Sequence, residues 1–365
     1  MPRGAFCGRC RSPHEVRAKH STVSISPLLS CGLLQGRSGL LLPLRRVSGK
    51  LLGVRTEITD SPEAAAQFIK AGGIVAFPTE TVYGLGADIF QEAAVSGIFA
   101  AKRRPADNPL IAHVGDLGQI DRLVTYIPES ARRFIKAFFP GPLTLVLKRA
   151  ENVPLIATAG LDTIGVRMPC SELAVEFLRE CGTPVVAPSA NLSGKPSPTT
   201  WQAVFDDLDG SIDCILKGEA TEIGLESTVV DCTGNVPVVL RAGAVAFETL
   251  REVVGDTIVF RADDERAARS PGMRHKHYAP DAAVLLIDSP GEITAAGAAY
   301  IGLDTPDAKI ERRLVCDSVE EYARALFAFF RECDRAGMRV IYCQKVKETG
   351  IGTALMDRLR RAAAR

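Results

Sequence analysis

The chain has 365 residues, of which 46% are apolar and 24% are charged, and its net charge at pH 7 is +1. This length and composition are typical of a globular protein with two domains. The near-neutral charge argues against a protein that binds nucleic acid through bulk electrostatics, although a local basic cleft stays compatible with it. No stretch has the apolar length of a membrane span, so we expect no membrane partner.

Residues 1–53 differ from the rest of the chain, because they hold nine Lys or Arg and a single acid, Glu15. An acid-poor leader rich in Arg and Ser is typical of an organelle transit peptide. An extension from an upstream start codon, with the natural start near Val54, explains the same pattern. We favour the second explanation and expect a disordered N-terminal extension on a cytoplasmic protein.

The ten cysteines are scattered and mostly lie in apolar runs, as expected of reduced thiols in a cytosolic protein. Cys7 and Cys10 have the spacing of zinc ligands, but no second pair accompanies them. His275 and His277, in the charged linker after residue 260, suit a metal by type and lack a third ligand. We therefore predict no metal held by the protein itself.

Residues 72–114 carry the strongest local signal. A buried strand at 74–77 leads into a loop, 79–86, that is dense in hydroxyls and glycine. The helix that follows, 91–104, ends in Lys102, Arg103 and Arg104. Such a loop lets backbone N–H groups approach an anion, and three consecutive cations exceed what a helix end requires. The pattern predicts an anion site in an α/β protein, although neither standard phosphate-loop motif is present and a solvated helix end is the alternative.

Two later features also point to bound anions. Arg167 lies between Val166 and Met168 on an apolar strand and must find an anionic partner, either in a structural ion pair or in a substrate carboxylate. The residues alone leave these two alternatives even. The polar loop 188–199 follows an apolar strand at 184–187, which is where α/β sheets usually bind ligands. Its alternative role is a turn that caps the next helix at Thr199 or Thr200.

The last third of the chain, from Ala283, alternates between predicted strands and helices. The order is a strand at 284–287, a helix, a strand, a helix at 319–336, a strand at 340–343 and a helix at 353–364. This alternation predicts a small parallel α/β domain. Gly350-Ile351-Gly352 weakly resembles a nucleotide-binding loop, but the N-terminal turn of the last helix is the better interpretation.

Five motifs together resemble the YrdC-like family of threonylcarbamoyl-adenylate synthases: FPTETVYGLG, AAKRRPADNPL, GVRMP, APSANLSGKPSPT and SPGMRHKHYAP. The last motif and the final third of the chain resemble the two-domain form of that family. The resemblance implies a YrdC-like twisted open mixed sheet with flanking helices at 54–257. It further implies a linker strap over the active site at 258–282 and a smaller C-terminal Rossmann-like parallel α/β domain at 283–365.

The resemblance also implies an activity. Members of this family condense ATP, L-threonine and bicarbonate to threonylcarbamoyl-AMP and release pyrophosphate, and the product feeds the threonylcarbamoyl modification of an adenosine in certain tRNAs. The implied ligands are therefore ATP with Mg²⁺, L-threonine and bicarbonate. Direct contact with tRNA and with the threonylcarbamoyl-transferase complex is left open.

Carried over position by position, the resemblance assigns the site residues. L-threonine would contact Thr81, His113, Arg167, Ala187 and Ser227. ATP would contact Arg104, Asn108, Thr163, Ser189, Ser197, Arg241 and Tyr278. Lys102 and Arg104 would be the catalytic residues, since the reaction brings together mutually repelling anions and needs positive charge rather than a covalent intermediate.

Two other functions stay open. A double-stranded RNA or tRNA binding module would use the same basic concavity and would show salt-sensitive RNA affinity without turnover. A carbamoyltransferase that forms carbamoyl-AMP, as in the YrdC-like segment of hydrogenase-maturation proteins, would be expected to carry acylphosphatase and zinc-finger segments. Neither segment is present in these 365 residues.

Overall fold

The computed structural model describes residues 55–260 and 278–364. The expectations for residues 1–53, for Cys7 and Cys10, for His275 and His277, and for most of the linker strap lie outside the described residues.

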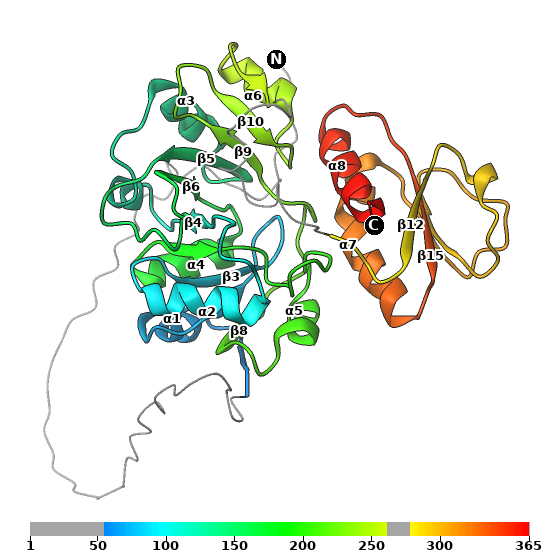
Figure 1. The fold of residues 1–365 in the computed structure, drawn as a ribbon, viewed down its shortest axis with the longest axis horizontal. Helices are drawn as coiled ribbons and strands as arrows, with labels where there is room; N and C mark the ends of the chain where they lie inside the picture. Colours follow the sequence, from blue (N-terminus) through cyan, green and yellow to red (C-terminus); the bar gives the residue numbers. More distant parts are fainter. Residues whose placement is uncertain (1–54, 261–277, 365) are drawn as a thin grey trace, which may run out of the picture. The chain divides into compact units, whose positions relative to one another are not determined.

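Residues 57–259 contribute eleven strands to one mixed sheet (Figure 1). The strands are β1 (Glu57–Thr59), β2 (Val75–Phe77), β3 (Gly84–Asp88), β4 (Ile111–His113), β5 (Leu143–Lys148), β6 (Thr163–Arg167), β7 (Val185–Ala187), β8 (Cys214–Leu216), β9 (Thr228–Asp231), β10 (Val238–Arg241) and β11 (Ile258–Val259). Their order across the sheet is β1-β8-β2-β3-β7-β4-β6-β5-β9-β10-β11. Strand β4 pairs parallel with β6 and antiparallel with β7, and this mixture confirms the predicted mixed sheet.

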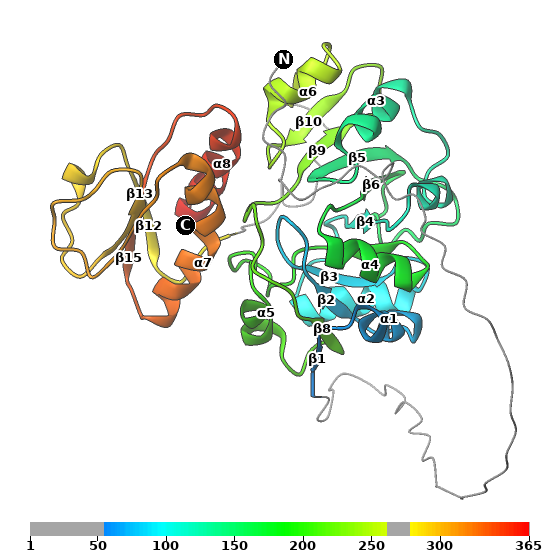
Figure 2. The ribbon, with the colours of Figure 1, turned by 180° about the vertical axis from the view of Figure 1, so that it is seen from behind.

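Helices flank this sheet on both faces and bury its central strands (Figure 1). The helices are α1 (Pro62–Lys70), α2 (Glu92–Lys102), α3 (Glu129–Phe138), α4 (Glu172–Cys181), α5 (Trp201–Leu208) and α6 (Phe247–Val253), with a 3-10 helix, η2 (Leu117–Arg122). Successive strand residues point to opposite faces. On β2, Ala76 therefore joins the core cluster that contains α2 and α3. Val75 and Phe77 join the cluster under α1 and α4, which Figure 2 shows side by side.

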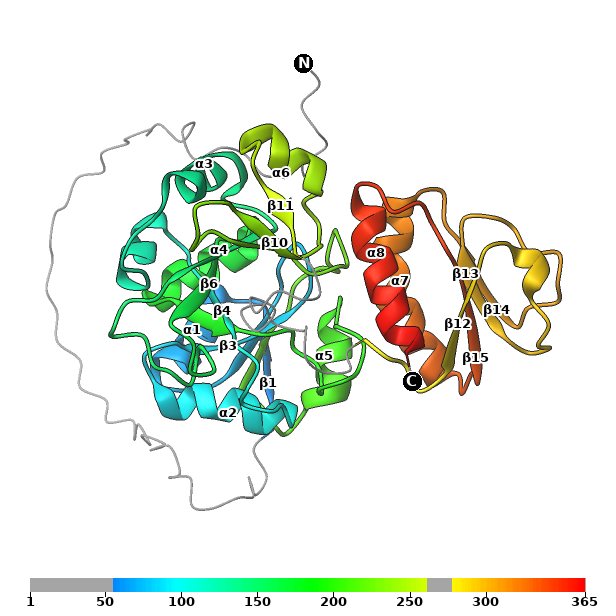
Figure 3. The same ribbon diagram turned by 45° about the horizontal axis from the view of Figure 1, so that its top comes forward.

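A second sheet, built from residues 283–344, is entirely parallel. Its strands are β12 (Ala283–Ile287), β13 (Ala299–Gly302), β14 (Arg312–Val315) and β15 (Val340–Gln344), in the order β12-β15-β13-β14. The helices α7 (Val319–Arg335) and α8 (Ile351–Ala363) pack next to each other against it (Figure 3). Phe330 of α7 and Leu359 of α8 are fully buried in this core with Ile341. The predicted Rossmann-like parallel domain is confirmed.

One predicted helix of this second domain is wrong. The segment between β12 and β13 forms only a short 3-10 helix, η4 (Pro290–Glu292). Pro290 and Gly291 disfavour helix propagation, and Gly297 adopts φ +70°. Strand β14 was not predicted, because its Arg312 and Arg313 are exposed and break the apolar pattern of a buried strand. Gly350 directly precedes α8, as the helix-turn interpretation of 350–352 requires.

Candidate active site

The last residues of four strands of the large sheet border one cavity, although β7 runs antiparallel to β4. His113 ends β4, Arg167 ends β6, Ala187 ends β7 and Arg241 ends β10, and all four residues line this space. Strand register brings His113 and Arg167 next to each other, since they pair across the parallel β4–β6 ladder. The space amounts to about 690 Å³ when its solvent-open part is included, so the cavity is accessible from outside.

Arg167 is buried, with 4% of its surface exposed, and all three of its nitrogens donate hydrogen bonds. Nε donates to Gly141 O at 3.4 Å, Nη1 to Thr81 Oγ1 at 2.9 Å and Nη2 to Glu80 Oε1 at 2.6 Å. Glu80 is itself buried, and its second oxygen accepts from the Cys170 N–H at 3.2 Å. The structural ion pair left open by the sequence is therefore present. Arg167 nevertheless lines the cavity, so its guanidinium is held rigidly beside the space where a ligand would sit.

The loop after β2 is fixed by its own hydroxyls. Thr79 Oγ1 donates to Val82 O at 2.7 Å and lies 2.8 Å from Thr81 Oγ1. It also accepts from the backbone N–H groups of Thr81 and Val82, at 3.2 and 3.3 Å. Thr81 is fully buried and faces Arg167. This hydrogen-bonded turn holds the Thr81 hydroxyl at the cavity wall.

His113 is a neutral group in the cavity wall at physiological pH. Burial, together with the nearby positive charge of Arg167, lowers its pKa to about 3. Nδ1 lies 3.1 Å from Ile111 O, so a proton on Nδ1 would be donated to this carbonyl oxygen. The ring packs edge-on against Phe77 at 5.7 Å. His113 therefore offers hydrogen bonding and shape to a ligand rather than charge.

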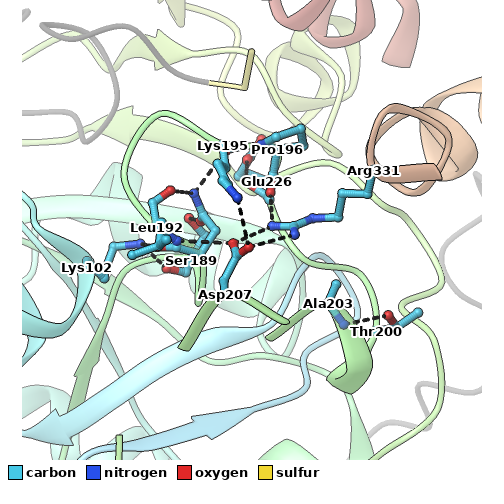
Figure 4. A network of polar contacts seen from close by, with 12 residues as sticks. Lys102, Ser189, Leu192, Lys195, Pro196, Thr200, Ala203, Asp207, Glu226 and Arg331 are labelled. Carbon is cyan, nitrogen blue, oxygen red and sulfur yellow. Dashed lines mark hydrogen bonds and ion pairs between the residues drawn. The ribbon is translucent and has the colours of Figure 1, made fainter. Parts of the chain in front are cut away.

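The three cations at the end of α2 lie in three different environments. Lys102 is buried behind the cavity wall, where Nζ donates to Ser189 O and to Asn191 O, each at 2.5 Å (Figure 4). Burial and the neighbouring Arg104 hold the pKa of Lys102 well below its usual value. Arg103 is exposed at φ 51° and closes the helix. Arg104 alone of the three lines the cavity.

Arg104 presents an unsatisfied donor. Its Nη2 makes two long hydrogen bonds, to Asn108 O at 3.3 Å and to Pro109 O at 3.4 Å. Its Nε is buried and, among the described residues, is one of a few side-chain nitrogens without a hydrogen-bond partner. Burial lowers the pKa of Arg104 to about 10, so the group stays charged at neutral pH. A buried donor without a partner is costly, and an anion in the cavity would satisfy it.

The loop after β7 and the chain around β9 complete the wall. Ser189 Oγ donates to Asn191 Oδ1 at 2.6 Å, and Ser197 Oγ donates to Glu226 Oε1 at 2.7 Å. Arg241 donates from Nε and Nη2 to Ser227 O, at 3.1 and 2.8 Å. Burial lowers the pKa of Arg241 from its ordinary value.

Tyr278 lies near the C-terminal end of the linker and lines the same cavity. Its φ of 69° is rare for a bulky residue, and its ring stacks on Phe327 of α7 at 5.4 Å. Such backbone strain persists only where the surroundings fix it, so the contacts of Tyr278 hold the ring at the cavity wall.

Ten of the thirteen assigned residues line the cavity, namely Thr81, Arg104, His113, Arg167, Ala187, Ser189, Ser197, Ser227, Arg241 and Tyr278. Lys102, Asn108 and Thr163 do not. Asn108 and Thr163 are both buried, and Thr163 opens β6, at the end of the strand opposite to Arg167, where it pairs with Lys148. Direct ligand contact by these three residues stays a prediction.

Sequence reasoning missed three charged residues of this region. Glu80 pairs with Arg167, Glu226 accepts from Ser197, and Lys195 lies at the cavity rim 3.8 Å from Asp207. Glu80 stands inside the hydroxyl-rich loop, and an acid flanked by two buried threonines is a usable local signal. Glu226 and Lys195 give no such signal, because their partners lie far away along the chain.

The described residues contain no cluster of three or more His, Cys, Asp or Glu side chains that could hold a metal ion. Among the described residues, Glu226 is the one carboxylate that lines the cavity, and it is already engaged by Ser197 and by Arg358 of α8. Six buried cysteines in residues 55–260 and 278–364 are free thiols, namely Cys181, Cys214, Cys232, Cys316, Cys333 and Cys343. No helix there is long and apolar enough to cross a membrane.

Comparisons with known proteins identify the family of this chain. A family profile described as "Telomere recombination" matches residues 67–243, and one described as "Threonylcarbamoyl-AMP synthase, C-terminal domain" matches residues 245–364. The threonylcarbamoyl-AMP synthase of Pyrococcus abyssi is 44% identical over 331 residues, which span 86% of this chain and 97% of that protein. The threonylcarbamoyl-AMP synthase of Bacillus subtilis is 40% identical over 328 residues, or 84% and 94% of the two chains.

A solved structure is similar over the same length. The crystal structure of P. abyssi Sua5 complexed with L-threonine matches with a TM-score of 0.78 at 41% sequence identity. The match covers 86% of this chain and 98% of that one. Both sheets of the present structure therefore fall within a region of shared fold.

Proposed function

This chain belongs to the threonylcarbamoyl-AMP synthase family, and we propose that its cavity gathers L-threonine, bicarbonate and ATP and forms threonylcarbamoyl-AMP with release of pyrophosphate. The observation that carries the proposal is the convergence of Arg104, Arg167 and Arg241 on one largely buried space. Glu80 already pairs with Arg167, but a cavity wall that carries three guanidinium groups still attracts anions. The reaction supplies a carboxylate, a carbonate and a triphosphate.

We place L-threonine at the Arg167 end of the cavity. The Sua5 structure of P. abyssi has the same fold and is complexed with L-threonine, which supports L-threonine as a ligand of this chain. The fixed guanidinium of Arg167 suits the substrate carboxylate, with the Thr81 hydroxyl beside it. The uncharged ring of His113 can lie next to the substrate amine without repelling it. Ala187 and Ser227 close this end with small side chains.

We place ATP beside L-threonine, against Arg104, Ser189, Ser197, Arg241 and Tyr278. The unsatisfied Nε of Arg104 supports a phosphate contact, since a phosphate oxygen would supply the missing acceptor. The ring of Tyr278, held by Phe327, presents an aromatic edge to the nucleoside. Lys102 would contribute without touching the nucleotide, because its two hydrogen bonds fix the 189–191 backbone that faces the nucleotide.

The chemistry needs proximity and charge rather than a covalent enzyme intermediate. The threonine nitrogen attacks the carbon of bicarbonate to form a carbamate, with loss of water. A carbamate oxygen then attacks the α-phosphorus of ATP, and the bond to pyrophosphate breaks. Arg104 and Arg241 would offset the negative charge that builds up on the phosphates, and their buried setting strengthens that effect. Mg²⁺ would arrive on the triphosphate and offset further charge, and we assign it no protein ligand.

The product would then serve the threonylcarbamoyl modification of tRNA, with tRNA and a threonylcarbamoyl-transferase complex as further partners. We assign this reaction to the cytoplasm, which the free thiols of the six buried cysteines support.

The test is pyrophosphate release from ATP, measured with L-threonine and bicarbonate added singly and together. We expect release only when both are present, and a threonylcarbamoyl-AMP product by mass spectrometry. Release that is indifferent to threonine would contradict the proposal. Turnover with carbamoyl phosphate in place of threonine and bicarbonate would indicate the carbamoyltransferase, and salt-sensitive RNA binding without any release would indicate the RNA-binding module.

A further inference from the structure

The cavity that must accept a polyanion contains a buried acid. Glu226 has 6% of its surface exposed and lines the cavity between Ser197 and Arg241. Oε1 accepts from the Ser197 hydroxyl at 2.7 Å, and Oε2 accepts from Arg358 Nε at 2.8 Å. A carboxylate beside a triphosphate site is unfavourable unless its charge is neutralised and its direction is fixed.

The neutralising group comes from the C-terminal domain. Arg358 lies on α8 and is fully buried. Besides the bond to Glu226, its Nη2 donates to Ala242 O at 3.0 Å and its Nη1 to Asp357 Oδ2 at 2.8 Å. Its guanidinium carbon also lies 5.3 Å from the ring centroid of Tyr278. One side chain of α8 thus contacts two cavity residues, Glu226 and Tyr278.

Electrostatics keep Glu226 ionised in this setting. Burial alone would raise its pKa, but the charges of Arg358 and Arg241, with the hydrogen bond from Ser197, lower it. The carboxylate is therefore charged at neutral pH. If Arg358 were absent, Arg241 would be the nearer cation toward which the carboxylate could turn. The acid would then compete with the phosphates of ATP on their own side of the cavity.

The loops that carry these residues are docked firmly onto the C-terminal helices. Arg331 of α7 donates to both oxygens of Asp207, at 3.1 and 2.8 Å, and to Pro196 O at 2.6 Å (Figure 4). Gly224 adopts φ +77°, and a Cβ there would come within 2.5 Å of the backbone of Arg324. Arg358 is therefore presented to Glu226 from a fixed support, as a positioning residue requires.

We propose that Arg358 of the C-terminal domain is a positioning residue for the ATP site, which holds Glu226 away from the bound phosphates and fixes Tyr278. The proposal rests on the proposed function for the identity of the ligand. It gives the C-terminal domain a direct part in nucleotide binding, although α8 supplies no residue that lines the cavity.

The test compares Arg358→Met with the double variant Arg358→Met/Glu226→Gln. For Arg358→Met we expect the KM for ATP and the Kd for Mg-ATP in calorimetry to rise at least about tenfold, while the KM for threonine changes less than about threefold. In the double variant, removal of the uncompensated charge should restore most of the ATP affinity. A purely structural role would instead make the double variant as weak as the single one, or weaker.

Arg360→Met is the matched control. Arg360 lies on the same helix, two residues further along, and its pair with Glu348 is about half exposed on both sides. We expect the Arg360→Met variant to bind ATP as tightly as the unmodified chain does. Equal losses in Arg360→Met and Arg358→Met, or an unchanged ATP affinity in Arg358→Met, would overturn the proposal.

Two further measurements keep the outcome decisive. If Arg358→Met does not fold, Arg358→Lys replaces it. A lysine preserves the charge but cannot reach both Glu226 and Ala242 O, so ATP affinity should fall by at least about threefold, and unaltered affinity would refute the idea. The calorimetry uses Mg-ATP alone and needs no turnover. A chain that binds ATP as predicted but makes no threonylcarbamoyl-AMP would therefore count against the proposed function and not against Arg358.

Discussion

Arg167→Lys separates the two roles that Arg167 can play. A lysine keeps one positive charge opposite Glu80, so the buried ion pair persists and the fold should survive. It loses the planar fork that would hold a substrate carboxylate through two parallel hydrogen bonds. Removing a hydrogen bond to a charged group costs about 1.5–3 kcal/mol, which corresponds to roughly a 10- to 150-fold increase in the threonine KM.

The assay is pyrophosphate release at saturating ATP and bicarbonate, with threonine varied, and a second series in which ATP is varied. We expect the ATP KM to change less than about threefold, because the assigned phosphate contacts are made by other arginines. Arg179→Lys is the control, since Arg179 is an exposed arginine of α4 that donates to Gly115 O at 3.2 Å, outside the cavity. A folded Arg167→Lys protein with an unaltered threonine KM would remove Arg167 from the threonine site.

Three further predictions concern the same region. Arg104→Gln should raise the ATP KM by about 10- to 100-fold with little change in the threonine KM, because a charged donor to a phosphate is lost; kinetics with each substrate varied would show this, and an equal rise in both KM values would contradict it. The pKa of His113 is lowered from its ordinary value of 6.5 to about 3, so at a pH between these values the ring takes up a proton when the chain unfolds. The free energy of unfolding should therefore fall as the pH drops below 6.5, by about 1.4 kcal/mol per pH unit. Denaturant unfolding at pH 7.5 and 5.5 should show this loss in the unmodified chain and less of it in His113→Asn; equal losses would be evidence against it. Gly224→Ala should lower the free energy of unfolding by about 2–4 kcal/mol, because alanine disfavours the left-handed φ and its Cβ would come within 2.5 Å of the Arg324 backbone. In the control Gly194→Ala, φ is +93° but the Cβ would meet open space, so the loss should be about 1–2 kcal/mol.

Local sequence patterns predicted the elements that carry the site. The strand before Pro78, the helix that ends at Lys102 and the strand that bears Arg167 all appear where hydrophobic periodicity and end signals placed them. The prediction failed between β12 and β13, where proline and glycine leave only a 3-10 helix, and at β14, whose exposed arginines hide the strand pattern. Short edge strands are poorly marked because one side of them faces solvent.

The amino-acid sequence determined the motifs, the family resemblance and most of the candidate site, because these depend on residue identity and on short spacings along the chain. Tertiary structure decided how each charge is used. Of the three consecutive cations at the end of α2, only Arg104 faces the cavity, since Lys102 ends the helix in the interior and the left-handed Arg103 redirects the chain. The partners of Arg167 and Glu226 lie 87 and 132 residues away along the chain, and only the folded sheet and the docked helix α8 bring those charges into contact.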